Sequence, residues 1–341
     1  MTTVHVYPAD TGGCGHYRLA WPAQALQARG HDVHLFPPGD VTTVPIVVLG
    51  SEVFVRRGAA LPDVLVIQRP MDWMWSQAIP KLRREGVRVV VDIDDDMHSL
   101  HGSHCGFWDV HPKGNPRANY KWLERALSQA SLITVTTPAL VERYGALAPH
   151  QLIPNFIPAA YLTVEHPRHD EVAVGWAGTV ATHPGDLNVI GSGLARARRK
   201  TPFVFMQLGE PEGVHRAVGV EPVHLPWVPI EEYPRSLAQF DVGIVPLAPS
   251  AFNEAKSWLK GLEMAAVGVP FVASPTTPYL TLAQRGAGDI ASNPKEWEHA
   301  IRKLVSDPAY RADRAADGKE RAMFLTIEGN VTFWEHAWLQ C

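Results

Sequence analysis

The sequence has few cysteines and no long apolar run, and both absences exclude classes of protein. Its 341 residues contain 3 cysteines at wide spacing. An odd number of distant cysteines favours reduced thiols over a disulfide framework or a zinc ribbon. No apolar run approaches the ~20 residues of a membrane-spanning helix. The start, MTTVHVYPAD, shows neither the basic region nor the apolar core of a signal peptide. We therefore expect a cytoplasmic protein.

The sequence also lacks a strong excess of charge of one sign. The formal net charge is -4, and charged residues make up 19% of the chain. This balance gives no strong reason to expect nucleic acid as a partner. The basic stretch WMWSQAIPKLRREG, residues 73–86, bears two tryptophans. It is consistent with peripheral contact at the inner membrane face, or with an ordinary packed helix.

Short apolar segments rich in β-branched residues alternate with helical patterns along most of the chain. This alternation is typical of parallel sheets with helices on both faces. The candidate strands are residues 4–9, 32–37, 45–50, 63–69, 87–94, 131–137, 172–178, 202–209, 223–228, 241–247 and 269–274. The candidate helices include residues 16–30, 119–130, 186–199, 231–240 and 256–268.

The rhythm of strands and helices is interrupted once, at a linker of about residues 156–170. A chain of this length is sufficient for about two domains. We therefore predict an α/β fold of two doubly wound, Rossmann-like domains that face a cleft. The predicted domains are residues 1–158 and 159–324, and a C-terminal helix, residues 325–341, crosses back to the first domain.

The segment FNEAKSWLKGLEMAAVGVPFVAS, which begins at Phe252, carries the most chemical information. A helix over residues 256–268 would place Lys256 and Ser257 in its first turn, where free backbone N–H groups favour an anion such as a diphosphate. Glu263 would lie about two turns further on the same face, where it could accept hydrogen bonds from a ribose diol. A surface helix with a Lys–Glu face is the other interpretation of this spacing.

This segment closely resembles the donor-binding segment of retaining glycosyltransferases of family 4. LIPNFIP, VAVGWAGTVATHPGDL and YPRSLAQFDVGIVPL resemble further segments of that family in the same order. The resemblance implies the glycosyltransferase-B fold, with an acceptor-side first domain and a donor-binding second domain. It also implies a nucleoside-diphosphate sugar as donor, transfer with retention of configuration, and no metal or other cofactor.

The resemblance assigns donor binding to Lys256, Ser257 and Glu263, and a catalytic role to Lys256 as the diphosphate departs. The family often has an earlier glutamate with seven residues between it and the second. Here that position is Ala255, and Glu254 is one residue out of register. The sugar and the base therefore stay open, and so does the acceptor, which could be a glycan, a lipid, a protein, a small molecule or modified DNA.

Two glycine-containing loops are candidates for donor contacts. In GWAGTVATHPGDL, Gly178 and Thr179 occupy a turn where a side chain would crowd a diphosphate. In DTGGCGHYR, Gly13 and Gly15 would let the backbone approach the distal phosphate or the sugar, and Arg18 begins the helix behind them. The GWAGTVATHPGDL loop does not have the G-x-G-x-x-G spacing of a dinucleotide site.

The segment VVVDIDDDMHSLH contains four closely spaced carboxylates, those of Asp92, Asp94, Asp95 and Asp96. Another glycosyltransferase architecture uses a D-x-D spacing to hold a divalent metal to the nucleotide diphosphate. That architecture is a single domain with one mixed sheet, and the two-part alternation of strands and helices argues against it. After a first-domain strand the cluster would face the cleft. Mutual repulsion would raise some pKa values, so that Asp94, Asp95 or Asp96 could act on the acceptor. Structural capping is the other interpretation.

The histidines allow several roles. His98 is a candidate hydrogen-bond donor to the sugar or the acceptor. Together with its histidine and cysteine neighbours it matches no zinc spacing. His183 is equally consistent with a loop hydrogen bond and with a ligand contact, and Asp186 is a candidate helix cap.

Other functions on the same fold stay open at this stage, because a fold does not determine its chemistry. A nucleotide-sugar epimerase or hydrolase is one alternative. A non-catalytic nucleotide-sugar binding protein is another, since the first family glutamate is out of register.

Overall fold

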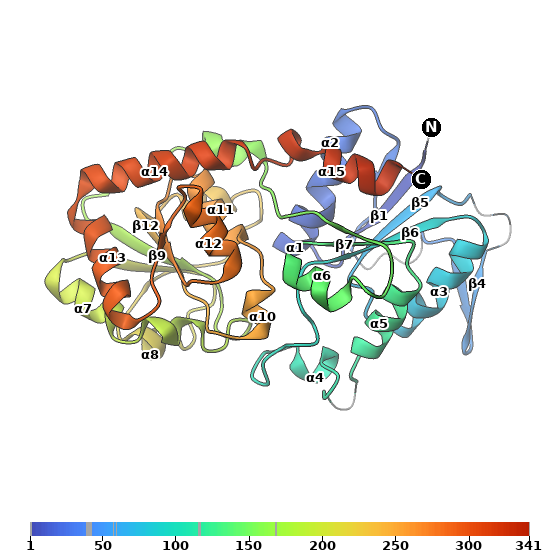
Figure 1. Cartoon of the computed structure of the whole chain (residues 1–341), viewed down its shortest axis with the longest axis horizontal. Coiled ribbons are helices and arrows are strands. Elements are labelled where there is room, and N and C mark those ends of the chain that lie inside the picture. The colour runs from blue at the N-terminus through green and yellow to red at the C-terminus, as the bar shows by residue number, and fades with distance from the viewer. Residues whose placement is uncertain are drawn as a thin grey trace.

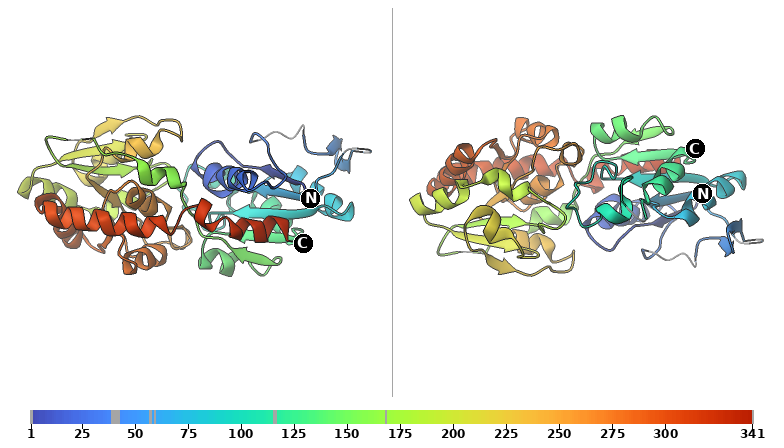
Figure 2. Two further views of the ribbon diagram at one scale, coloured as in Figure 1. Left: turned by 90° about the horizontal axis from the view of Figure 1, so that it is seen from above. Right: turned by 90° about the horizontal axis from the view of Figure 1, so that it is seen from below.

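Two parallel sheets organise the chain, and each is the centre of its own α/β domain. The computed structural model describes residues 2–38, 43–56, 58, 60–114, 117–167 and 169–340. Within these residues each domain contains one six-stranded parallel sheet. The domains lie side by side (Figure 1), and helices cover both faces of each sheet (Figure 2). The predicted α/β fold of two doubly wound domains is therefore confirmed.

The first sheet has the strand order β2-β1-β5-β6-β7-β8. Its strands are β1 (Val4–Tyr7), β2 (Val33–Leu35), β5 (Val64–Gln68), β6 (Arg88–Ile93), β7 (Leu132–Val135) and β8 (His150–Leu152). β5 and β7 are buried along their whole length, as expected for strands that helices cover on both sides. The strand order reverses between β1 and β5, so the loops after these strands open a crevice at the carboxyl edge.

The second sheet has the strand order β11-β10-β9-β12-β13-β14. Its strands are β9 (Ala173–Ala177), β10 (Val204–Leu208), β11 (Val223–Leu225), β12 (Val242–Val245), β13 (Phe271–Ala273) and β14 (Asp289–Ile290). This is the order of dinucleotide-binding sheets, with the reversal between β9 and β12. The loops that follow these two strands are therefore the expected position of a ligand.

Helical segments connect the strands in both domains. The first domain contains α1 (Gly13–Gly15), η1 (His16–Ala20), α2 (Trp21–Ala28), α3 (Trp73–Arg84), α4 (Phe107–Val110), α5 (Tyr120–Ser128) and α6 (Pro138–Tyr144). The second contains η3 (Asp186–Ile190), α7 (Gly193–Lys200), α8 (Val214–Val218), α9 (Tyr233–Leu237), α10 (Ala251–Glu254), α11 (Leu259–Ala266), α12 (Thr277–Gln284), α13 (Pro294–Ser306) and α14 (Pro308–Met323). Between the domains lies η2 (Ala159–Thr163), and η4 (Glu328–Asn330), α15 (Thr332–Trp334) and η5 (Glu335–Leu339) end the chain.

One segment that was expected in the first sheet, residues 45–50, lies outside it. Here β3 (Ile46–Leu49) pairs antiparallel with β4 (Glu52–Val55) in a separate hairpin. Val48 and Leu49 are 43% and 64% exposed, unlike residues of an inner strand. The prediction of a sheet strand was wrong, because a short apolar run does not show whether the chain turns back directly after it.

Two predicted helices are broken into shorter pieces. The helix expected over residues 186–199 is divided into η3 and α7, because Gly191 has a φ of 51° and ends the first piece. The helix expected over residues 325–341 consists of η4, α15 and η5. Near its start the Thr326 hydroxyl accepts a hydrogen bond from the Gly329 N–H at 3.2 Å. Such side-chain contacts compete with regular helix.

The chain crosses between the domains twice, and the crossing segments lie beside each other. The backbone N–H of Ile157 donates to Leu325, and the N–H of Ile327 donates back to Ile157. Beyond this point the C-terminal segment (red) returns to the first domain (Figures 1 and 2). There the Arg88 guanidinium donates to the carbonyl of Ala337 at 2.7 Å. The last residues are thereby attached to the first sheet.

The basic stretch with two tryptophans forms α3, which packs on the first sheet. The Asp72 carboxylate caps this helix by accepting from the N–H of Trp75, and Trp75 is buried while Trp73 packs against the same core. The two tryptophans of this stretch therefore contribute to the interior, whereas Arg83 and Arg84 are exposed. Among the described residues, the longest helices are all too short or too polar to span a bilayer.

We predict that Trp338→Ala destabilises the first domain by ~3–5 kcal/mol, because it removes a large side chain from the core. Trp338 is 1% exposed. Phe333→Ala, on the same segment but 37% exposed, is the matched control and should cost much less. Chemical unfolding of both variants measures the difference. Equal midpoints for the two would contradict this description of the C-terminal segment.

Candidate functional site

Loops at the carboxyl edges of both sheets enclose a cavity of about 570 Å³. The loop after β1 contributes Thr11, Gly12, Gly13 and Cys14, and the loop after β9 contributes Gly178, Thr179, Thr182 and His183. Tyr17 and the segment Trp227 to Ile230 complete the walls, with Tyr233, Leu259, Lys260 and Glu263. Both domains therefore supply walls of the cavity, at the strand reversals where α/β sheets bind ligands.

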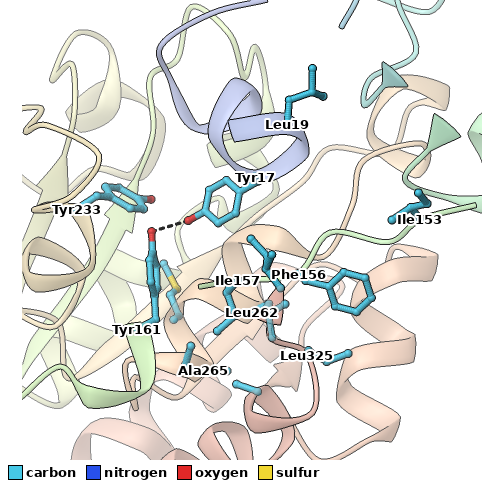
Figure 3. Close-up of a cluster of buried hydrophobic side chains, with 14 of the residues drawn as sticks. Tyr17, Leu19, Ile153, Phe156, Ile157, Tyr161, Tyr233, Leu262, Ala265 and Leu325 are labelled. Carbon is cyan, nitrogen blue, oxygen red and sulfur yellow. Dashed lines mark hydrogen bonds between the residues drawn. The ribbon is translucent and has the colours of Figure 1, made fainter. Parts of the chain in front are cut away.

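Glu263 is a carboxylate that lines the cavity and is surrounded by tyrosine side chains. It lies on α11 and is 4% exposed, and the Tyr233 hydroxyl is 3.5 Å from its Oε2. The Tyr17 and Tyr161 hydroxyls lie 2.6 Å apart close by (Figure 3). Burial raises the pKa of Glu263 to about 7, although hydrogen bonds from Tyr17 and Tyr233 and the charge of Lys260 oppose the rise. The side chain therefore changes charge near neutral pH.

Lys260, which the sequence analysis did not single out, supplies positive charge to the cavity. Its Nζ donates to the Ala177 carbonyl at 3.0 Å and lies 3.1 Å from His183 Nε2. Burial, followed by the charge of Lys256, lowers the pKa of Lys260 to about 8. Among the described lining residues, Lys260 supplies the ammonium group and Glu263 the carboxylate, and His183 lies beside Lys260.

Gly178 permits the close packing around this ammonium group. A Cβ atom at position 178 would lie 2.9 Å from the Trp176 ring and 3.1 Å from Lys260 Nζ. The contact with Trp176 is closer than a Cβ atom tolerates and the one with Lys260 is tight, so the turn favours glycine. The sequence analysis expected crowding of a ligand at this turn, and the structure shows crowding of the lysine that lines the cavity.

Lys256 and Ser257 lie before α11 rather than in its first turn, as the sequence analysis had expected. α10, which the Ser250 hydroxyl caps at its start, ends at Glu254, and α11 begins only at Leu259, with a non-helical break over residues 255–258. Lys256 Nζ is 3.2 Å from Asp95 Oδ1 in the other domain. The Ser257 hydroxyl accepts from Asn155 at 2.8 Å. Both side chains thus connect the domains, and neither belongs to the described lining of the cavity.

The four carboxylates of the Asp92–Asp96 cluster each have a cationic partner. The pairs are Asp92 with Arg18 at 2.7 Å, Asp94 with Arg69 at 3.5 Å, Asp95 with Lys256 at 3.2 Å, and Asp96 with Arg143 at 3.3 Å. Burial acts to raise the pKa of Asp94, but the charges of Arg69 and Arg18 and a hydrogen bond from Cys14 together outweigh it, so the pKa lies below its usual value. The expected rise from mutual repulsion is therefore wrong for Asp94.

The glycine loop after β1 is held by its own aspartate. The Asp10 carboxylate accepts from the N–H groups of Gly12 and Gly15 and pairs with Arg69. A Cβ atom at Gly15 would lie 2.0 Å from the Asp10 carbonyl. Gly15 is thus required by the fold of the loop itself, whereas Gly13 lines the cavity.

Arg18 is fully buried and lies outside the described lining of the cavity. Its guanidinium donates to both oxygens of Asp92, to the Ile153 carbonyl at 2.7 Å and to Asn155 Oδ1 at 3.0 Å. These contacts occupy the side chain within the first domain and the crossing segment. The structure therefore places Arg18 in a supporting position behind the glycine loop.

A second cavity of about 470 Å³ shares Thr182 and His183 with the first. His101, Ser103 and His104 line it from the first domain. His98 lies near this region but packs against Tyr120, with ring centroids 5.2 Å apart, and is not among the lining residues. Among the described residues, no group of three or more potential ligand side chains is arranged to hold a metal ion.

Comparison with solved structures identifies the fold. No protein-family model matches the sequence, and neither does any curated protein. Sucrose-phosphate synthase from Thermosynechococcus elongatus is 16% identical, with a TM-score of 0.68 over 99% of this chain and 98% of that chain. HepE from Anabaena, in complex with UDP-glucose, is 14% identical, with a TM-score of 0.67 over 99% of both chains. A glycosyltransferase from Rickettsia africae is 9% identical, with a TM-score of 0.66 over 98% and 97%.

These similarities extend over nearly the whole length of each chain. They show that the protein has the glycosyltransferase-B fold, which confirms the fold that the sequence resemblance implied.

We predict that Arg18→Ala lowers the free energy of unfolding by ~3–5 kcal/mol, because it leaves the buried carboxylate of Asp92 unpaired. The double variant Arg18→Met/Asp92→Leu removes both charges and should recover part of this loss. Chemical unfolding of the three proteins is the measurement. An Arg18→Ala protein of unchanged stability would contradict the supporting role of Arg18.

Proposed function

We propose that this protein is a retaining glycosyltransferase that moves a sugar from a nucleoside-diphosphate sugar to a hydroxyl-bearing acceptor. The observation that carries the proposal is the cavity between the domains, which combines Glu263, Lys260 and two glycine loops. A carboxylate suits a ribose diol, and an ammonium group suits a diphosphate. HepE, one of the similar structures, was solved with UDP-glucose, which supports this class of donor.

On this proposal, the charged and aromatic lining residues define the orientation of the donor in the cavity. Glu263 accepts the ribose hydroxyls, and the nucleobase lies toward Trp227, which is 46% exposed beside Val228 and Pro229. The diphosphate lies between Lys260 and the loops of Gly13 and of Gly178 and Thr179. Lys256 adds positive charge from the domain interface, since its charge already acts on Lys260.

The proposed reaction forms a bond between the acceptor oxygen and the anomeric carbon while the bond to the diphosphate oxygen breaks on the same face. The acceptor proton passes to the departing diphosphate. The pairing of Asp94, Asp95 and Asp96 with cations supports this route, because a carboxylate in an ion pair is a weak base. The protein's contribution is electrostatic stabilisation of the leaving group, for which Lys260 is positioned, and the proposal requires no metal.

A screen with nucleoside-diphosphate sugars tests the function directly. A donor at ~100 times its Kd should stabilise the protein by ~2.7 kcal/mol, which thermal melting detects. The bound donor is then incubated with and without candidate acceptors, and NMR gives the anomeric configuration of the product. An inverted product contradicts retention. Free sugar or an epimer formed without acceptor would establish the hydrolase or epimerase instead, and binding without turnover would favour a non-catalytic binding protein.

We predict that Lys260→Ala weakens donor binding ~10- to 100-fold, the usual effect of losing a hydrogen bond to a charged group. Lys256→Ala should weaken it less, because Lys256 already pairs with Asp95. Lys295→Ala, an exposed lysine on α13, is the control for loss of one positive charge. Calorimetric titration with the donor gives the three dissociation constants. A larger loss for Lys256→Ala than for Lys260→Ala would refute this placement of the diphosphate.

We further predict that donor affinity is highest between about pH 7 and about pH 8. The ribose requires ionised Glu263, whose pKa is about 7, so affinity should fall as the pH decreases below it. The diphosphate requires charged Lys260, whose pKa is about 8, so affinity should fall as the pH increases above it. The diphosphate of a nucleotide sugar is doubly esterified and does not titrate in this range.

The groups around Glu263 are consistent with assigning the acidic limb of the pH profile to this residue. Tyr17, Tyr161, Tyr233 and Tyr279 face it, and burial raises the pKa of each hydroxyl, so they stay neutral across this range. The Glu263→Gln variant should bind the donor more weakly. Its affinity should no longer fall at acidic pH but should still fall at basic pH. A variant that keeps the acidic limb would show that another group causes it.

A further inference from the structure

His183 lies between a carboxylate and the lysine of the proposed donor site. Its Nδ1 is 3.0 Å from Asp186 Oδ2, and its Nε2 is 3.1 Å from Lys260 Nζ. Because a carboxylate only accepts hydrogen bonds, Nδ1 carries the ring proton and Nε2 presents a lone pair to the ammonium group. Burial and the charge of Lys260 lower the pKa of His183, which keeps the ring neutral as this arrangement requires.

Asp186 is itself held in place from two directions. Its Oδ1 accepts from the backbone N–H of Ala248 at 2.8 Å and from Asn253 Nδ2 at 2.7 Å. The side chain is 2% exposed. Ala248 follows β12 and Asn253 belongs to α10, so the carboxylate is fixed to elements other than its own loop. Such a carboxylate determines the orientation of the imidazole that donates to it.

The contacts of Lys260 leave one N–H bond of its ammonium group for a ligand. The ammonium group has three N–H bonds, and the acceptors at Ala177 and His183 occupy two of them. Lys260 also lines the cavity between the domains. His183 lines it as well, but its single ring proton is directed to Asp186, so the ring has no N–H to offer to a phosphate.

We propose that His183 and Asp186 are positioning residues, which hold Lys260 so that its remaining N–H points at the diphosphate of the donor. The inference rests on the proposed function, since it assumes that the cavity binds a nucleoside diphosphate. The histidine acts through the lysine and not on the ligand. Its removal should therefore weaken binding of the phosphates and leave binding of the nucleoside intact.

A double-mutant cycle between His183 and Lys260 tests the inference. UDP, ADP and GDP are titrated into the wild-type protein by calorimetry, and the one that binds most tightly is carried forward with its nucleoside. His183→Ala should raise the Kd of the diphosphate about tenfold, the scale of a hydrogen bond to a charged group, with the nucleoside Kd unchanged. In the Lys260→Ala background, His183→Ala should change the diphosphate Kd less than about twofold.

Two further variants and a control make the result specific. His183→Gln keeps an oxygen that can accept from Lys260, so it should lose less affinity than His183→Ala. Asp186→Asn provides a second cycle with Lys260→Ala if His183→Ala does not fold. His215→Ala is the matched control, because His215 also pairs with a carboxylate, that of Glu221 at 3.0 Å, on the exposed surface of the second domain. It should bind like the wild type.

The outcomes separate the two proposals. Additive effects of His183→Ala and Lys260→Ala, or an equal loss for the nucleoside, overturn the positioning role while diphosphate binding by the wild type stands. A wild-type protein that binds none of the three diphosphates overturns the proposed function, and the positioning role with it.

Discussion

The buried guanidinium of Arg18 is the contact on which the arrangement of the two domains depends. It pairs with Asp92 of β6 and donates to Asn155 of the crossing segment. Asn155 in turn donates to the Ser257 hydroxyl, and its carbonyl accepts from Trp258 Nε1 at 2.9 Å. Ser257 and Trp258 directly precede α11, the helix that carries the charged residues of the cavity. A buried charge is costly unless its partners are in place, so these contacts together fix α11 relative to the first sheet.

The acidic cluster after β6 illustrates how tertiary partners decide the chemistry of a motif. Four carboxylates within five residues suggest repulsion, a metal site or catalysis when the sequence is considered alone. In the structure each of them pairs with a cation that is remote in sequence, from α6 in the case of Asp96 to the second domain in the case of Asp95. The cluster thus connects elements around the end of β6. No local pattern could show this, because the partners come from four different segments.

The sequence was sufficient for the features that depend on local periodicity. Continuous apolar runs between helical patterns predicted both parallel sheets, and Glu263 and Gly178, both predicted to bind the donor, line the same cavity. Lys260 was missed because the choice between Lys256 and Lys260 depends on where α11 begins. One helical turn separates the two lysines, and both precede Glu263 on the same segment. The chain breaks between α10 and α11, so α11 begins only at Leu259, and the two lysines have different neighbours: Asp95 for Lys256, and Ala177 and His183 for Lys260.

The two lysines differ in what holds them, and this difference determines which one presents an uncompensated positive charge to a ligand. Lys256 pairs directly with Asp95, so much of its charge is compensated. Lys260 is held by a backbone carbonyl and a neutral imidazole, acceptors that orient an ammonium group without cancelling its charge. The carboxylate of Asp186 lies on the far side of the His183 ring from Lys260. Since electrostatic attraction falls with distance, placing a neutral ring between the carboxylate and the ammonium group preserves the positive potential at the cavity wall while keeping the lysine in a fixed orientation.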